Sequence, residues 1–445
     1  MKITHISSAA VLIENKGTKV LCDPWLVGDE YYGSWTVHPP LDDVDFSMFD
    51  DVDYIYISHI HPDHLSEETL KKIKKDVPVL IHKYDEPFLK RNLARLGRNV
   101  IELKHGEKFE CGADLNIYIY ASDDCNPEIC FKFFGCGKSK SVDGGSTGID
   151  TMSVFESSDH CILNVNDCPY ELSKTALSRV LANHKPVDLL LVGYAGAGSY
   201  PQCWSCYSDD DKLNKYGVKK KNHFLNMGLD YISQVQPKYY MPFAGTYVLS
   251  GKNAKLERFR VVPTLDEALD FYKEKNNSSK GLLLNSFSSF DLNDESIPKY
   301  KPLDREAQIK YCEEVLINKK YIFDKDEEPS LSSIISLIPE AYNRYNKKRE
   351  ELAFSTNTNI YIYLPEEKML KISADGSGYN VINKVDFSDE KFVSYKLNFK
   401  LLYRILRGPK YAHWNNAEIG SHIEFFRKPE VYERKLYYSM NFFHS

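Results

Sequence analysis

The feature that most constrains this chain is the segment 59–64, which reads His-Ile-His-Pro-Asp-His. It follows a short apolar, β-branched run at residues 54–58 that predicts a strand. Two histidines two positions apart on an extended segment project to the same side, and an aspartate and a third histidine follow at the turn. Imidazole and carboxylate groups are ligands for zinc, iron and manganese. The pattern predicts a site for one or two divalent ions, with His59, His61, Asp63 and His64 as ligands. The alternative is a histidine-rich loop without metal.

The order of the predicted elements indicates a layered α/β protein. Residues 2–6, 10–15 and 19–22 predict three strands joined by tight turns, and shorter strands then alternate with amphipathic helices. Such an order places helices outside the sheets. After about residue 285 the sequence becomes polar, and helical and strand patterns follow it. We therefore expect a catalytic domain at residues 1–285 and an α+β domain at residues 290–445.

Composition excludes several classes of function. The net charge of −6 provides no basic field for nucleic acid. No apolar run is long enough to span a membrane, so we expect no membrane span. The ten cysteines are irregularly spaced and no export signal precedes them, which favours reduced thiols in a cytoplasmic protein. The expected partner is a small-molecule substrate.

Several segments in one order carry a family resemblance. They are the metal motif with its flanks (residues 54–66), Asp-Pro-Trp-Leu-Val-Gly at 23–28, Asn-Asp-Cys at 166–168, Ala-Gly-Ala-Gly-Ser-Tyr-Pro at 195–201 and Gln-Pro-Lys-Tyr-Tyr-Met-Pro-Phe-Ala-Gly at 236–245. The chain resembles the metallo-β-lactamase superfamily, in the branch with L-ascorbate-6-phosphate lactonase. It is more closely similar to the catalytic region of the CMP-N-acetylneuraminate hydroxylases. The resemblance covers about residues 1–290 and implies a four-layer αβ/βα fold.

The resemblance also implies further metal-site residues. Asp167 ends a predicted strand and matches the bridging ligand, although it could instead cap the next helix. Asp23 is expected to orient a ligand histidine, the alternative being a turn aspartate before proline. Many superfamily hydrolases place a histidine after the strand at residues 115–121. Here that loop has none, and Asp124 is the candidate replacement, which would favour iron or manganese over zinc.

Two further segments are candidates for substrate binding. Gly196 and Gly198, with Tyr200, follow a predicted buried strand, and the glycines allow close approach of a ligand to the backbone. A tight structural loop explains them equally well. Trp25 begins an aromatic stretch that can line the site or form a hydrophobic lid over the core, and the two roles are compatible.

Three functions are compatible with these residues. The first is a hydrolase in which a metal-bound hydroxide attacks an ester, lactone or phosphodiester, with the catalytic Asp63 orienting the nucleophile or accepting its proton. The second is a non-haem iron oxygenase acting on a nucleotide sugar or a related small molecule. The hydroxylase family carries a Rieske iron–sulfur domain, whereas this sequence has no Cys-x-His pair, so a separate reductase would deliver the electrons. The third is a binding module without catalysis.

Overall fold

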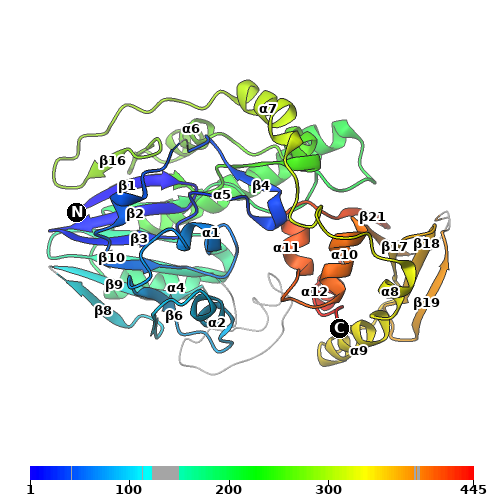
Figure 1. Cartoon of the computed structure of the whole chain (residues 1–445). Coiled ribbons are helices and arrows are strands. Elements are labelled where there is room, and N and C mark those ends of the chain that lie inside the picture. Colours follow the sequence, from blue (N-terminus) through cyan, green and yellow to red (C-terminus); the bar gives the residue numbers. More distant parts are fainter. Residues whose placement is uncertain (42, 113, 123–149, 385–386, 388–390) are drawn as a thin grey trace.

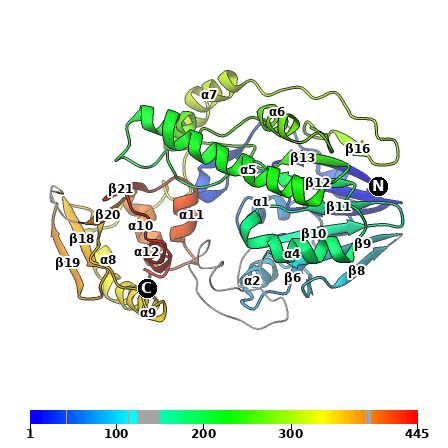
Figure 2. The same ribbon diagram turned by 180° about the vertical axis from the view of Figure 1, so that it is seen from behind.

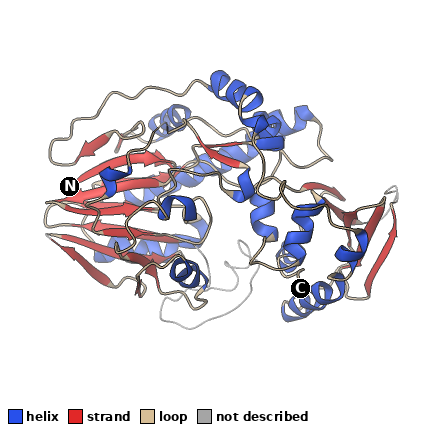
Figure 3. Cartoon of the chain, viewed as in Figure 1, coloured by secondary structure: helices blue, strands red, loops and turns tan. Residues whose placement is uncertain are grey.

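A computed structural model describes residues 1–41, 43–112, 114–122, 150–384, 387 and 391–445. Figure 1 shows two packed sheets in the N-terminal part of the chain and a smaller sheet with helices in the C-terminal part. The predicted four-layer αβ/βα fold with a C-terminal α+β part is confirmed. Figure 3 shows the strands of the two large sheets facing each other, with the helices outside them.

The first sheet has the order β16-β1-β2-β3-β5-β6-β7. It begins as an antiparallel meander and continues with parallel strands from β3 to β7. A two-residue turn, Lys16-Gly17, joins β2 to β3, and both residues have positive φ, as a tight hairpin requires. The strands are β1 (Lys2–Ser7), β2 (Ala10–Asn15), β3 (Thr18–Cys22), β5 (Tyr54–Tyr56), β6 (Val79–His82), β7 (Val100–Leu103) and β16 (Ser289–Asp291).

The second sheet has the order β15-β13-β12-β11-β10-β9-β8 and repeats the same design. Strands β8 to β11 are antiparallel, and β11, β12, β13 and β15 are parallel. The strands are β8 (Lys108–Gly112), β9 (Leu115–Ala121), β10 (Thr151–Glu156), β11 (Cys161–Asn164), β12 (Leu189–Gly193), β13 (Tyr239–Phe243) and β15 (Lys280–Gly281).

Three hydrophobic clusters hold the layers together. The central cluster lies between the sheets and contains apolar residues of both, for example Ile13 and Ile117. A second cluster packs α4 (Tyr170–Asn183), α5 (Val218–Val235) and α6 (Leu265–Lys275) against the second sheet, as Figure 2 shows from behind. A third packs α1 (Glu67–Leu70) and α2 (Phe88–Arg95) against the first sheet. The carboxyl ends of the parallel strands thereby meet at one edge of the sandwich.

The C-terminal part is built on the five-stranded sheet β19-β18-β17-β20-β21. One buried cluster joins this sheet to the helices and also includes Trp204 and Tyr207 of the N-terminal part. The elements are α8 (Leu331–Ile335), α9 (Ile338–Glu351), β17 (Asn359–Leu364), β18 (Lys368–Ser373), β19 (Gly378–Asn383), β20 (Phe392–Lys396), α10 (Phe399–Leu406), α11 (Trp414–Ile419), β21 (Glu424–Lys428) and α12 (Arg434–Met440).

The segment between the two parts packs on the N-terminal part. Strand β16 extends the first sheet to residue 291. Helix α7 (Arg305–Glu314) and the 3-10 turn η5 (Leu316–Asn318) pack beside η4 (Gly251–Phe259) and β14 (Tyr247–Leu249), which pairs with β4 (Trp35–Val37). We therefore propose to divide the domains near residue 320, later than the expected 285/290. Among the described helices, none has the length and apolar character that a membrane span needs.

Candidate metal centre

The metal motif lies in the loop that leaves the carboxyl end of β5. The amides of His64 and Leu65 both donate to the carbonyl oxygen of His61, which folds the segment into a tight turn. His59 is fully buried and His64 and Asp63 are buried, at 0%, 1% and 9% exposure. The turn thus buries three of the four polar side chains of the motif between the two sheets, and the fourth, His61, is half-buried.

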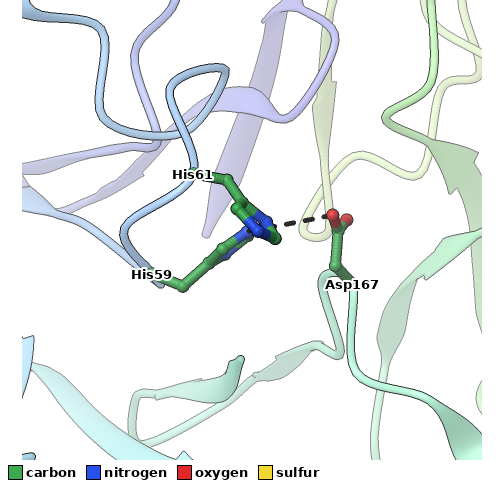
Figure 4. Close-up of side chains that lie close together, drawn as sticks. All are labelled: His59, His61 and Asp167. Atoms are coloured by element: carbon green, nitrogen blue, oxygen red, sulfur yellow. Dashed lines mark hydrogen bonds and ion pairs between the residues drawn. The ribbon is translucent and has the colours of Figure 1, made fainter. Parts of the chain in front are cut away.

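A first group of ligand atoms gathers around His59. Its Nε2 lies 2.9 Å from Nδ1 of His61 and 3.9 Å from Oδ2 of Asp167. The ligand atoms of these three residues all lie within 4.8 Å of one another, and Figure 4 shows them converging from two different segments. Asp167 follows β11, so the carboxylate reaches the histidines from the second sheet.

A second group gathers around His64. Its Nε2 lies 3.5 Å from Oδ2 of Asp63 and 3.4 Å from Oδ2 of Asp167. The same oxygen of Asp167 therefore faces both histidine groups. The alternative helix-capping role of Asp167 is wrong, because Pro169 occupies the N-cap position of α4. The position agrees with the predicted bridging role, which stays a prediction.

Asp150 was missed by the sequence reasoning. Its Oδ1 lies 3.8 Å from Nε2 of His59, and its side chain is buried directly before β10. The signal in the sequence was weak, because Asp150 directly follows the Gly-, Ser- and Lys-rich stretch 136–149. The predicted ligand Asp124 lies outside the described residues.

The spacing of most of these donor atoms suits metal ligation, whereas Nε2 of His59 and Nδ1 of His61, at 2.9 Å, lie closer together than two ligands of a tetrahedral ion. Bonds of about 2.0–2.2 Å in a tetrahedral arrangement put neighbouring ligand atoms about 3.3–3.6 Å apart. The spacings of His64 to Asp63 and to Asp167, 3.5 and 3.4 Å, match that range. The distances from His59 to Asp150 and Asp167 are slightly larger, at 3.8 and 3.9 Å.

Asp23 lies behind the histidines and organises them. It is fully buried and accepts hydrogen bonds from the Ser58 amide (2.7 Å), the Ser58 hydroxyl (2.7 Å) and the Asn166 amide group (2.5 Å). Its Oδ2 lies 3.1 Å from Nδ1 of His64. A carboxylate on Nδ1 keeps the proton there and leaves Nε2 as the ligand atom. Asp23 is thus placed where an orienting residue is needed.

The protonation states suit a cation site. Burial lowers the pKa of His59 well below its usual value and that of His61 to about 4, so both imidazoles are neutral. Burial also raises the pKa of Asp63. For His64, burial lowers the pKa, but Asp167, Asp63 and Asp23 together raise it well above 6.5. The cluster therefore stabilises positive charge beside His64, as a metal-binding site does.

The predicted substrate residues have different surroundings. Trp25 as a lining residue is wrong, because its side chain is fully buried among aromatic residues and its Nε1 donates to the Gly28 carbonyl. Gly196 packs so closely on Phe224 that a Cβ would lie 1.8 Å from the ring. Gly198 has φ of +97° and open space beside it. Tyr200 packs against the C-terminal core cluster. Substrate contact by Gly196, Gly198 and Tyr200 stays a prediction.

A family model described as the beta-lactamase superfamily domain matches residues 2–243. The chain belongs to this family. It is a metalloenzyme of the metallo-β-lactamase fold, and its His/Asp cluster is the place for the one or two metal ions of that fold.

The chain is similar to several curated proteins over its N-terminal part. It is 28% identical to a Mycolicibacterium smegmatis protein provisionally named a Rieske 2Fe-2S iron-sulfur protein, over 55% of this chain and 43% of that one. It is 27% identical to the human inactive cytidine monophosphate-N-acetylneuraminic acid hydroxylase, over 57% of this chain and 47% of that protein. The Macaca mulatta hydroxylase is also 27% identical, over 57% of this chain and 40% of that protein. The chain thus spans less than half the length of these relatives.

Solved structures also resemble the chain. CmlA, a diiron beta-hydroxylase from Streptomyces venezuelae, gives a TM-score of 0.42 at 15% identity, covering 65% of this chain and 54% of that one. An isothiocyanate hydrolase from Delia radicum gut bacteria gives 0.44 at 15% identity, covering 65% and 99%.

Proposed function

We propose that this chain is a dinuclear iron enzyme that hydroxylates a small molecule with electrons from a separate protein. The observation that carries the proposal is the grouping of His59, His61 and Asp167, whose ligand atoms all lie within 4.8 Å of one another, with Oδ1 of Asp150 3.8 Å from Nε2 of His59. Two histidines and one carboxylate are a donor set typical of non-haem iron oxygenases.

The side chains divide into two ligand groups and a bridge. His59, His61 and Asp150 would hold one ion, Asp63 and His64 the other, and Asp167 would lie between the two. When bound, iron supplies the redox chemistry that activates dioxygen. The chain itself contributes neutral imidazoles at His59 and His61, three carboxylates that balance the cationic charge, and a loop in which His59, Asp63 and His64 are buried.

The relatives support this choice, because the Macaca mulatta protein is named a hydroxylase, the human protein an inactive hydroxylase, and the Mycolicibacterium smegmatis protein bears a Rieske iron–sulfur name. The sequence has no Cys-x-His ligand pair. An iron–sulfur protein of the Rieske or ferredoxin type is therefore the proposed electron donor. A nucleotide sugar is the first substrate class to test.

The hydrolase, the first function expected from the sequence, stays as the second candidate. The observation that favours it is the shared oxygen of Asp167, 3.9 Å from His59 and 3.4 Å from His64. Two closely spaced ions can also activate water for attack on an ester, lactone or phosphodiester. Asp63 would then accept a proton from the attacking water. Burial raises the pKa of Asp63, which makes its carboxylate a better proton acceptor. The completeness of the motif argues against a binding module without catalysis.

The deciding experiment compares protein loaded with iron and protein loaded with zinc. For the iron form we expect dioxygen consumption with a chemical reductant, stimulated by nucleotide sugars, and loss of consumption in Asp150→Ala. Asp159→Ala, on an exposed turn, is the matched control. Cleavage of ester or phosphodiester substrates by the zinc form, without dioxygen consumption by the iron form, would overturn the hydroxylase in favour of the hydrolase.

A further inference from the structure

The metal site is in contact with the C-terminal domain through Tyr31. The Tyr31 hydroxyl donates to Oδ1 of Asp63 at 2.7 Å, and the side chain is buried. The other oxygen of Asp63, Oδ2, faces Nε2 of His64 at 3.5 Å. The two oxygens of Asp63 thus have separate partners, and Tyr31 fixes the rotation of the carboxylate.

The backbone that presents Tyr31 is strained. Tyr31 and Tyr32, in the 3-10 turn η1 (Tyr31–Gly33), have φ of +49° and +64°. Bulky aromatic residues rarely adopt this left-handed region, and such conformations persist only where the surroundings enforce them. On one side Trp35 packs on the Tyr31 ring, with centroids 4.3 Å apart, and stacks on Tyr247 at 3.3 Å.

On the other side the C-terminal domain holds the turn. Nε2 of His422 lies 2.7 Å from the Tyr31 carbonyl oxygen, which can only accept, so His422 donates. The backbone amide of His413 donates to the Tyr32 hydroxyl at 2.7 Å. Gly420 lies so close that a Cβ on it would be 2.9 Å from Cβ of Tyr31. The approach of this segment to η1 therefore depends on the absence of a side chain at residue 420.

The holding segment, residues 420–422, is itself fixed by the N-terminal domain. The side-chain amide of Asn253 donates to the Ser421 carbonyl at 2.8 Å, and that of Gln202 donates to the Ser421 hydroxyl at 3.1 Å. The His422 ring packs edge-on against Tyr321, with centroids 4.8 Å apart, and against Phe323. The contacts form one continuous path from the C-terminal core through His422 and Tyr31 to Asp63.

We propose that the C-terminal domain is a positioning device for the metal site, in which His422 holds Tyr31 so that Asp63 turns one oxygen toward the ion shared with His64. This inference rests on the metal centre proposed above. Tyr31 and His422 are positioning residues, because they act on the site through Asp63. The path also explains why a domain outside the metallo-β-lactamase fold packs against η1.

The test measures Zn²⁺ binding by titration of the metal-free full chain. Tyr31→Phe keeps the ring and removes only the hydroxyl, so we expect an intact fold. The affinity for the second Zn²⁺, the ion expected at Asp63 and His64, should fall 10- to 100-fold. His422→Phe should lower the affinity for the same ion about threefold to tenfold and leave the affinity for the first ion unchanged. His422→Gln, whose amide can still donate, should restore binding. His223→Phe, at an exposed helical position, is the control.

The double variant separates a shared path from two independent effects. Because both residues act through Asp63, the variant carrying Tyr31→Phe and His422→Phe should bind the second Zn²⁺ no more weakly than Tyr31→Phe alone. Two ions bound within twofold of wild type in Tyr31→Phe would overturn the positioning role and leave the metal centre standing. A wild-type chain that binds no Zn²⁺ would overturn the metal centre and the positioning role together.

Discussion

The two seven-stranded sheets share one topology but supply the metal site in different ways. The first sheet contributes three imidazoles and a carboxylate from one turn after β5, spanning residues 59–64. The second contributes two carboxylates, Asp150 before β10 and Asp167 after β11. Figure 4 shows the meeting of the two contributions at His59, His61 and Asp167. One sheet thus carries a local motif, whereas the other completes the site only when the strands are assembled.

The difference shows which half of the site depends on the fold. The turn at residues 59–64 is closed by its own backbone hydrogen bonds, so those ligands lie close together both in sequence and in space. Asp150 and Asp167 are brought together by the antiparallel pairing of β10 with β11. The carboxylates of the second sheet should therefore control the number of bound metal ions and the choice between iron and zinc.

The largest expected effect comes from removing the bridge. Asp167→Ala takes away the one oxygen that faces both histidine groups, so we expect both ions to be lost, with at least a 100-fold fall in affinity. His61→Ala should lose chiefly the ion held with His59. Elemental analysis of each variant measures the loss, with Asp159→Ala as the control. A full complement of ions in Asp167→Ala would contradict the bridging role of Asp167.

A smaller effect is expected from Asp23, which lies at the junction of the sheets. Asp23→Asn keeps the size of the side chain but replaces the carboxylate that accepts from Nδ1 of His64. The new amide group would also face the donating amide group of Asn166. We expect metal affinity to fall about 10- to 100-fold. Metal titration of the purified variant checks this, and Asp53→Asn, on the loop before β5, is the matched control. Unchanged affinity would mean that Asp23 only stabilises the turn before Pro24 and does not orient His64.

Asp150→His should change which metal binds more than how tightly it binds. Replacing a carboxylate with an imidazole makes the donor set more nitrogen-rich and favours zinc. Protein exposed to equal iron and zinc should show an iron-to-zinc ratio about tenfold lower than wild type. The ratio is read by elemental analysis. A ratio equal to that of wild type would place Asp150 outside the ligand set.

The smallest effect concerns pH and the C-terminal domain. Burial lowers the pKa of His422 to about 4, against about 6.5 in an unfolded chain. The unfolded chain therefore binds more protons between pH 6.5 and 4, and His422 makes the folded state less stable as the pH falls through this window. Between pH 7 and pH 5 this effect amounts to about 2 kcal/mol of unfolding free energy, which His422→Gln should lose. Urea unfolding of the metal-free protein at pH 7 and pH 5 measures the free energy of unfolding at each pH. The same change between the two pH values in wild type and in His422→Gln would contradict this prediction.

Much of the fold and half of the site could be predicted from the sequence, because those features are local. The strands β1 to β3 and the motif after β5 follow from short patterns, whereas Asp167 was expected from the family resemblance. The placement of Trp25 failed because an aromatic residue after a strand packs inward as readily as it lines a site.

The rest depends on contacts between distant residues. Asp150 comes within 3.8 Å of His59 although 91 positions separate them, and no spacing rule covers such a distance. The contact of His422 with Tyr31 joins two domains across 391 positions. The positive φ of Tyr31 goes against its residue type and exists only because the surrounding structure enforces it. Local patterns carry no record of these three features.

The central claim is that both sheets together hold two metal ions, and the most direct measurement is the metal-to-chain ratio of protein purified without chelator. Elemental analysis beside Asp167→Ala should give about two ions per wild-type chain, mainly iron, and none in the variant. A wild-type chain without metal after anaerobic addition of iron or zinc would contradict the account.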